Sequence, residues 1–258
     1  MELKIKIMVR RVFAGQKGAG MKKAILAVLY GISLALLMSA GVQADTNAVS
    51  EYFPLKTGNE WIYKSYVTRE DGVEMSIPVT RRVKSSEKAG GKEVFTLEVE
   101  SDRVENLYIS GDKEGRFYEK IKYKGMTLVF KPAAYFIPAR TVLGGAEVRR
   151  NGTVKMYNDK NELVDQGSYV VGITSEGRQN LEVPAGVFKD ALKILVFLEI
   201  TTSSQATEVT QEIYLAEGLG MIKVNRIDKV VSLPKNEQIT LFYQRDELES
   251  AIIDGKEI

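Results

Sequence analysis

The chain has 258 residues, with 36 lysine and arginine residues against 34 aspartate and glutamate residues, and it contains neither histidine nor cysteine. The lack of cysteine excludes a disulfide framework. The lack of histidine excludes histidine-based catalytic triads and removes the commonest ligand for transition metals. We therefore predict no catalytic residue, no metal site and no cofactor.

Residues 21–44 have the layout of a secretory signal peptide. Lys22 and Lys23 precede an apolar run from Ala24 to Met38, and Val42-Gln43-Ala44 follows as a small-x-small cleavage site. This pattern predicts cleavage between Ala44 and Asp45 and a location in the periplasm or outside the cell. The apolar run is shorter than the roughly 20 residues that span a bilayer. The sequence therefore favours a cleaved signal over an uncleaved anchor, with only transient membrane contact, and no cysteine is present there for lipid attachment.

Met21 is the natural start of this leader, because the codons for Lys17-Gly18-Ala19 can contain a ribosome-binding sequence just upstream of the Met21 codon. We expect residues 1–20 to be a mis-called N-terminal extension, residues 21–44 the signal peptide, and residues 45–258 a single β-rich domain. The leader holds seven basic residues and one acidic residue, which leaves 29 basic and 33 acidic residues and a net charge of −4 in the rest. A mildly acidic chain is poorly suited to nucleic acid, whose binding needs a basic surface.

Alternation of apolar and polar residues dominates residues 45–258 and predicts β-strands. In the first predicted strand, Trp61, Tyr63, Ser65 and Val67 share one face. Similar alternation occurs at Phe95–Glu100, Phe117–Tyr123, Val209–Leu215, Ile222–Val224 and Ile239–Tyr243. Short strands with little helical pattern between them predict an all-β fold, in the form of an antiparallel curved sheet or open barrel with little helix.

Turn residues separate the predicted strands. Asn151-Gly152 is a strong signal for a tight type I′ hairpin between residues 148–150 and 154–156. The other predicted turns are Asp71-Gly72, Gly90-Gly91, Asp112–Gly115 and Asn158–Asn161.

Two apolar segments depart from the alternation. Ile194–Leu198 is apolar on both faces, which favours a strand covered on both sides over one that lines an internal apolar space. Met126–Leu143 contains Pro132 and Pro138, which argue against a central strand, yet it is too apolar for a free loop. We predict a cross-over that plugs one end of the barrel, and the alternative is a lid over an apolar cavity.

Helix is expected in two short segments. Thr46–Tyr52 follows the predicted cleavage site and can form one short helical turn. In Asp246–Ile253, Leu248, Ile252 and Ile253 recur at helix-like spacing, which predicts about two turns packed on a sheet edge.

Three segments carry a family resemblance. Tyr52–Tyr63 reads YFPLKTGNEWIY and resembles the F-P-L-x-x-G-x-x-W-x-Y opening of a broad group of uncharacterised exported bacterial β-rich proteins. Val183–Leu192 (VPAGVFKDAL) and Tyr214–Lys223 (YLAEGLGMIK) are similar to their V-P-A-G-x-F and G-x-G-x-[IV]-K patterns, with Tyr214 where many members have tryptophan. The resemblance implies an exported protein with a fold similar to that of the periplasmic lipoprotein carriers. It implies no activity.

Backbone and packing requirements can account for the same motifs without a ligand. Pro184 and Gly186 suit a tight turn, after which Phe188 re-enters the core. Gly218 and Gly220 can take positive φ in a hairpin that joins two predicted strands.

Aromatic-rich strands and the absence of catalytic residue types favour a non-enzymatic protein that binds an apolar ligand, a lipid or an acylated peptide, in the cell envelope. The alternative is a structural or interaction module that pairs with another exported envelope protein through a strand edge or the C-terminal segment. A carboxylate-dependent hydrolase is a third hypothesis, and it would need two acids about 5–10 Å apart in a polar cleft. The residues predicted to contact an apolar ligand are Trp61, Tyr63, Phe130, Tyr135, Phe136 and Phe197.

Overall fold

A computed structural model describes residues 46–68, 72–233 and 237–258. The predicted extension, the signal peptide and its cleavage site lie outside the described residues. Helices α2 (Thr46–Tyr52) and α3 (Ala139–Val142) are short, and the first of them was predicted. The strands are β1 (Glu60–Thr68), β2 (Glu74–Ala89), β3 (Lys92–Glu100), β4 (Val104–Asp112), β5 (Gly115–Tyr123), β6 (Met126–Pro138), β7 (Val148–Asn158), β8 (Leu163–Val183), β9 (Gly186–Thr202), β10 (Gln205–Ala216), β11 (Gly220–Ser232), β12 (Glu237–Ile253) and β13 (Lys256–Glu257).

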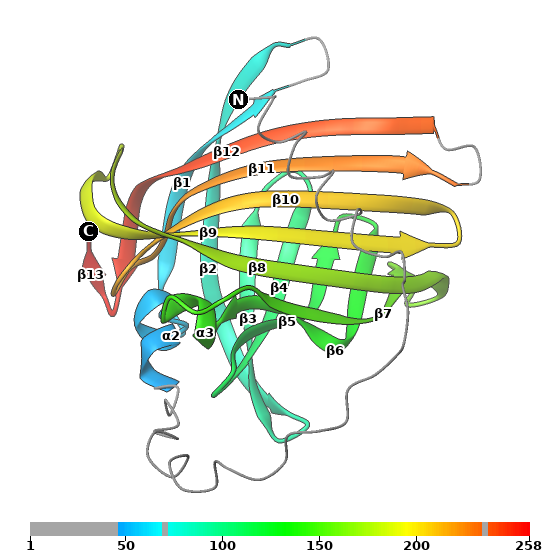
Figure 1. Ribbon diagram of the computed structural model, residues 1–258, viewed down its shortest axis with the longest axis horizontal. Coiled ribbons are helices and arrows are strands. Elements are labelled where there is room, and N and C mark those ends of the chain that lie inside the picture. Colours follow the sequence, from blue (N-terminus) through cyan, green and yellow to red (C-terminus); the bar gives the residue numbers. More distant parts are fainter. Residues whose placement is uncertain (1–45, 69–71, 234–236) are drawn as a thin grey trace, which may run out of the picture. The chain divides into compact units, whose positions relative to one another are not determined.

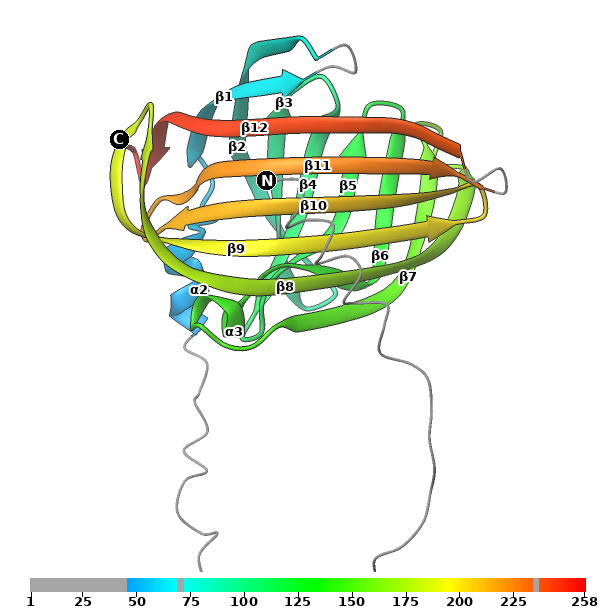
Figure 2. The same ribbon diagram turned by 45° about the horizontal axis from the view of Figure 1, so that its top comes forward.

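The strands form one antiparallel sheet in sequence order, and this sheet closes into a barrel. Closure comes from pairing of β1 with β12, while β13 pairs with the end of β12. Figures 1 and 2 show β8 to β12 as the near wall, with β3 to β7 crossing steeply behind them. The predicted antiparallel all-β fold is confirmed, and it is a closed barrel, because the first and twelfth strands of the sheet pair with each other.

Segment Met126–Pro138 is strand β6 of the barrel wall and pairs with β5 and β7, so the prediction that its prolines bar it from a central strand was wrong. These residues form neither the predicted plug nor the alternative lid. Pro138 ends the strand, and Pro132 lies at a break in the pairing. The register with β7 ends at Lys131, and the register with β5 passes from Val129 directly to Ala134. Proline has no N–H to donate, and a break of this kind tolerates it. The cross-over that follows the strand is α3, which packs beside α2 (Figure 1).

Asn151 and Gly152 lie inside strand β7, so the predicted hairpin at this position was wrong. The two residues pair with Val170 and Tyr169 of β8. A Cβ atom on Gly152 would lie 2.5 Å from the carbonyl oxygen of Lys131 and 2.7 Å from the Tyr169 ring. The glycine therefore permits close approach of a neighbouring backbone and an aromatic ring, and it does not form a turn.

We expect Gly152→Ala to lower the free energy of unfolding by about 1–3 kcal/mol, because the added methyl group meets backbone that cannot move aside easily. Urea denaturation would measure this loss. Gly172→Ala in β8 is the matched control, because its Cβ would first meet the flexible Glu147 carboxylate at 3.0 Å. Equal losses in the two variants would contradict the steric explanation.

Residues 246–253 belong to strand β12, so the predicted C-terminal helix was wrong. The register with β1 shifts at Ile62, and Glu249 is the extra residue of a β-bulge. The bulge changes which residues face the core, so that Asp246 and Leu248 are buried before it and Ala251 and Ile253 after it. One inserted residue turns a spacing of two into a spacing of three, which imitates a helix in the sequence.

Most of the other turn predictions are confirmed. Residues 90–91, 112–115 and 158–161 join β2 to β3, β4 to β5 and β7 to β8. Gly72 precedes β2 with a φ of +80°, while Asp71 lies outside the described residues. Pro184-Ala185 joins β8 to β9, and Phe188 then packs half-buried against the core. Gly218 and Gly220 take φ values of +75° and +106° in the turn between β10 and β11.

Candidate functional site

The barrel encloses a cavity of about 510 Å³. All twelve barrel strands contribute inward-facing side chains to its lining, and most of these side chains are apolar. This volume lies within the roughly 300–1,000 Å³ typical of small-molecule sites. Representative apolar lining residues are Val79, Leu107, Leu128, Met156, Val171 and Val209.

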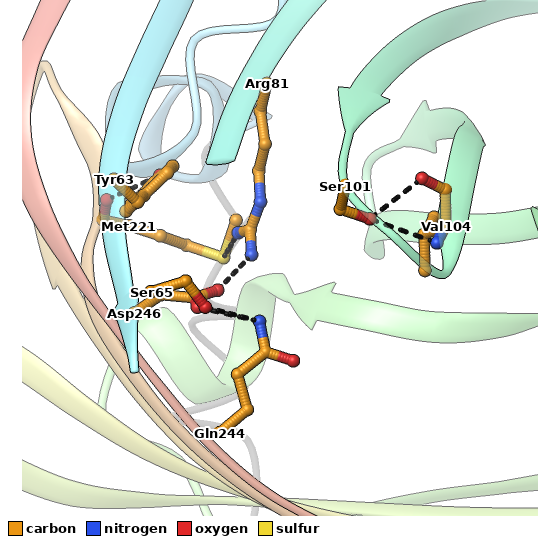
Figure 3. Close-up of polar contacts among 8 residues, drawn as sticks. All are labelled: Tyr63, Ser65, Arg81, Ser101, Val104, Met221, Gln244 and Asp246. Carbon is orange, nitrogen blue, oxygen red and sulfur yellow. Dashed lines mark hydrogen bonds and ion pairs between the residues drawn. The ribbon is translucent and has the colours of Figure 1, made fainter. Parts of the chain in front are cut away.

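The cavity meets solvent beside two chain connections. Asp102 and Arg103 in the β3–β4 loop and Lys124 in the β5–β6 turn line the cavity and are exposed. Figure 3 shows how Ser101 shapes this loop: its hydroxyl donates to the carbonyl of Val104 at 3.0 Å and accepts from the Val104 N–H at 3.1 Å. We refer to residues 101–103 and Lys124 as the rim.

Strand β9 lines the cavity with alternate residues. Val196 and Leu198 face inward, whereas the side chain between them, Phe197, is 39% exposed and faces away from the cavity. The prediction of a strand covered on both sides was therefore wrong, and the alternative, a strand that lines an internal apolar space, is correct.

Of the six aromatic residues predicted to contact a ligand, the structure places Tyr135 and Phe136 in the cavity lining. Both come from the second half of β6, beyond the break at Pro132. Phe130, before that break, is buried edge-on against Tyr169 and does not line the cavity. Both parts of β6 line the cavity, through Met126 and Leu128 before the proline and through Ala134, Tyr135 and Phe136 after it.

Trp61 and Tyr63 are buried in the core next to the cavity and are absent from its lining. The Trp61 indole N–H donates to the carbonyl of Leu219 at 2.6 Å, and the Tyr63 hydroxyl donates to the carbonyl of Met221 at 2.9 Å. Burial raises the pKa of Tyr63, although the nearby Arg81 cation opposes this effect. The two aromatic residues join β1 to the start of β11.

One side of the cavity is polar, which the sequence analysis did not predict. Arg226 and Asp228 of β11, and Gln244 and Asp246 of β12, all point inward. The sequence signal was the two-residue spacing of Val224, Arg226 and Asp228. This spacing places the two charged side chains on the same inward face of the strand as Val224. We call these four residues the polar stripe.

Asp246 of the polar stripe forms a buried ion pair with Arg81 of β2 (Figure 3). Arg81 Nη2 lies 2.6 Å from Asp246 Oδ2, and the two side chains are 14% and 2% exposed. Gln244 Nε2 donates to the other Asp246 oxygen at 2.7 Å and to Ser65 Oγ at 3.1 Å. The Arg81 guanidinium lies 4.6 Å from the centre of the Tyr63 ring. One cation and one anion are thus matched, and the carboxylate has a donor on each oxygen.

A second charged cluster lies nearer the rim. Arg226 donates to Asp228 through Nε at 2.7 Å and Nη2 at 3.0 Å, a bidentate pair. Arg103 Nη1 approaches the same carboxylate at 3.4 Å, and its guanidinium carbon lies 4.1 Å from the centre of the Phe242 ring. Burial acts to lower the pKa of Arg226, but Asp228 and Tyr123 outweigh it and raise this pKa overall. Two cations therefore share one carboxylate.

Within the described residues, no group of three or more acidic side chains is placed to hold a metal ion. The helices of that part of the chain are all too short or too polar to cross a membrane. The fold and the site together define a closed antiparallel β-barrel with an apolar internal cavity and a polar stripe.

No family model matches the chain, and no curated protein matches its sequence. Three solved structures are similar to it, with low sequence identity and low TM-scores. A predicted lipoprotein from Parabacteroides distasonis has 13% identity and a TM-score of 0.39, over 78% of this chain and 97% of that one. A predicted exported protein with a YmcC-like fold from Bacteroides fragilis has 11% identity and a TM-score of 0.37, over 78% and 98%. The hypothetical lipoprotein YmcC from Escherichia coli has 7% identity and a TM-score of 0.37, over 80% and 87%. These values do not assign the chain to a family.

Proposed function

We propose that the protein is a non-enzymatic, exported binder of an apolar ligand, a lipid or an acylated peptide, which it holds inside the barrel. The observation that supports this function is the cavity of about 510 Å³, whose lining is predominantly apolar. Transfer of a hydrocarbon chain from water into such a space is favourable in proportion to the apolar area removed from water. The leader sequence supports export, to the periplasm or beyond.

The two other hypotheses have less support. The buried acids of the cavity, Asp228 and Asp246, are each ion-paired with arginine, an arrangement that suits charge neutralisation better than proton transfer. Pairing with another protein through a strand edge is limited by closure, because β1 and β12 pair with each other.

A neutral fluorescent probe, N-phenyl-1-naphthylamine, tests the proposed function without depending on ligand charge. We expect the purified protein to bind the probe with enhanced fluorescence. Leu198→Trp adds bulk to the cavity lining and is expected to weaken binding at least tenfold, about 1.4 kcal/mol.

Phe197→Trp is the matched control, because the same residue type is introduced one position away on the outward face of β9. This variant is expected to bind the probe like the wild type. Absence of probe binding by the wild type would contradict the proposed function, as would equal losses in the two variants.

A further inference from the structure

We propose that the ligand is a single-chain amphiphile with a carboxylate head group, which Arg103 and Arg226 bind at the rim end of the cavity. This inference rests on the proposed function and specifies its ligand. Its basis is the arrangement of charges inside a cavity that is otherwise mainly apolar.

The two arginines reach the same point from different parts of the barrel. Arg226 projects from β11, and Arg103 projects from the β3–β4 loop on the rim. Both contact Asp228, which is almost completely buried. The cluster is therefore a built feature at the junction of the polar stripe and the rim.

The charges in this cluster are not balanced. Asp228 neutralises one arginine, so that the three groups together carry a net charge of +1. The deeper Arg81–Asp246 pair is balanced one to one, and Gln244 occupies the second carboxylate oxygen. An anion that enters the cavity therefore meets a net positive charge and free guanidinium donors at the rim cluster, whereas the deeper pair offers neither.

Arg103 is the arginine best placed to meet the ligand. Arg226 holds Asp228 with two contacts, at 2.7 and 3.0 Å, whereas Arg103 makes a longer contact, at 3.4 Å. The Arg103 side chain is 46% exposed, so it can turn toward a head group that enters from solvent. A guanidinium group presents paired N–H donors that match a carboxylate.

This position orients the rest of the ligand. A head group at the rim leaves the hydrocarbon chain to extend past Leu107 and Leu198 toward Phe136, along the apolar lining. A cavity of about 510 Å³ suits one such chain better than a two-chain lipid.

The test compares three probes with the same chain length, decanoate, decanol and decyltrimethylammonium, each measured by displacement of N-phenyl-1-naphthylamine. We expect decanoate to bind the wild type at least tenfold more tightly than decanol, and the cation to bind most weakly. Arg103→Ala should reduce the preference for decanoate over decanol to less than threefold, because it weakens decanoate binding more than decanol binding.

Arg82→Ala is the matched control, because the Arg82 side chain is also 46% exposed and is ion-paired, with Glu60. It does not line the cavity, and it should leave the order and ratio of the three affinities unchanged. Arg103→Lys should retain part of the preference, because it keeps the charge but loses the paired donors.

The outcomes separate this inference from the proposed function. Equal binding of decanoate and decanol by the wild type would overturn the head-group assignment and leave an apolar-ligand binder intact. Preference for the cation, or an undiminished preference for decanoate over decanol in Arg103→Ala, would also overturn it. Failure to bind the fluorescent probe and all three amphiphiles would overturn the proposed function itself.

Discussion

Arg81→Met is expected to lower the free energy of unfolding by about 3–5 kcal/mol, because it leaves the buried Asp246 carboxylate without its cation. Asp246 is 2% exposed, and its contact with Arg81 is 2.6 Å long. Gln244 would remain as a neutral donor, which cannot balance a full negative charge in this environment. Urea denaturation at neutral pH measures the loss.

Two comparison variants separate charge burial from simple loss of packing. Arg81→Met/Asp246→Leu removes both charges and is expected to recover most of the stability, since apolar replacement of a buried pair is often close to neutral. Arg82→Met affects the exposed ion pair with Glu60 and should change stability by no more than about 1 kcal/mol. A double variant as unstable as the single Arg81 variant would refute the explanation.

Trp61→Ala is expected to cost about 3–5 kcal/mol of unfolding free energy, because it empties a large, fully packed site. Trp61 is 1% exposed, and its ring is stacked on Phe53 with centroids 5.5 Å apart. Its indole N–H also holds the carbonyl of Leu219, which is 158 residues away in the chain. The substitution therefore removes the contacts that Trp61 of β1 makes with Phe53, next to α2, and with the β10–β11 turn.

Trp61→Phe is the informative control. It keeps most of the apolar volume and the stacking on Phe53 but loses the indole donor, so we expect a smaller loss, of about 1–3 kcal/mol. Thermal and urea denaturation of both variants would measure the difference. If Trp61→Phe is as damaging as Trp61→Ala, the hydrogen bond dominates over packing at this site.

Two of the motifs that carry the family resemblance meet in space. The first contains Phe53 and Trp61, and a Cβ atom on Gly220 of the other would lie 3.3 Å from both of these rings. Gly218 in the same turn donates its N–H to the carbonyl of Glu51 at 2.6 Å. These residues are explained by packing at one end of the barrel, away from the cavity lining.

The strands that sequence analysis found are those with clean alternation of large apolar residues, such as β1 and β3. Strands β2, β4 and β8 were not predicted. In β2, only Val79 and Val83 of sixteen residues are buried, so most of the strand reads as polar chain. Its place in the sheet comes from pairing with its chain neighbours β1 and β3, which the apolar pattern of β2 itself does not reveal.

The candidate site was predictable only in part. Tyr135 and Phe136 were predicted because aromatic residues in an apolar segment suggest a ligand surface. Arg81 and Arg226 were not, because charged residues in strands usually face solvent. Phe197, in contrast, was predicted to contact a ligand, yet it faces outward, because a strand side chain one position away from the cavity lies on the other face.

The sequence by itself determined the antiparallel all-β class, most of the turns, the first helix and the expectation of export. These properties depend on local patterns: period-two alternation, glycine at positive φ and the composition of the leader. Closure of the barrel, the bulge at Glu249, the break at Pro132 and the cavity with its polar stripe were decided by the tertiary structure. The physical reason is that each depends on register between strands, and register decides which face of a strand becomes the interior.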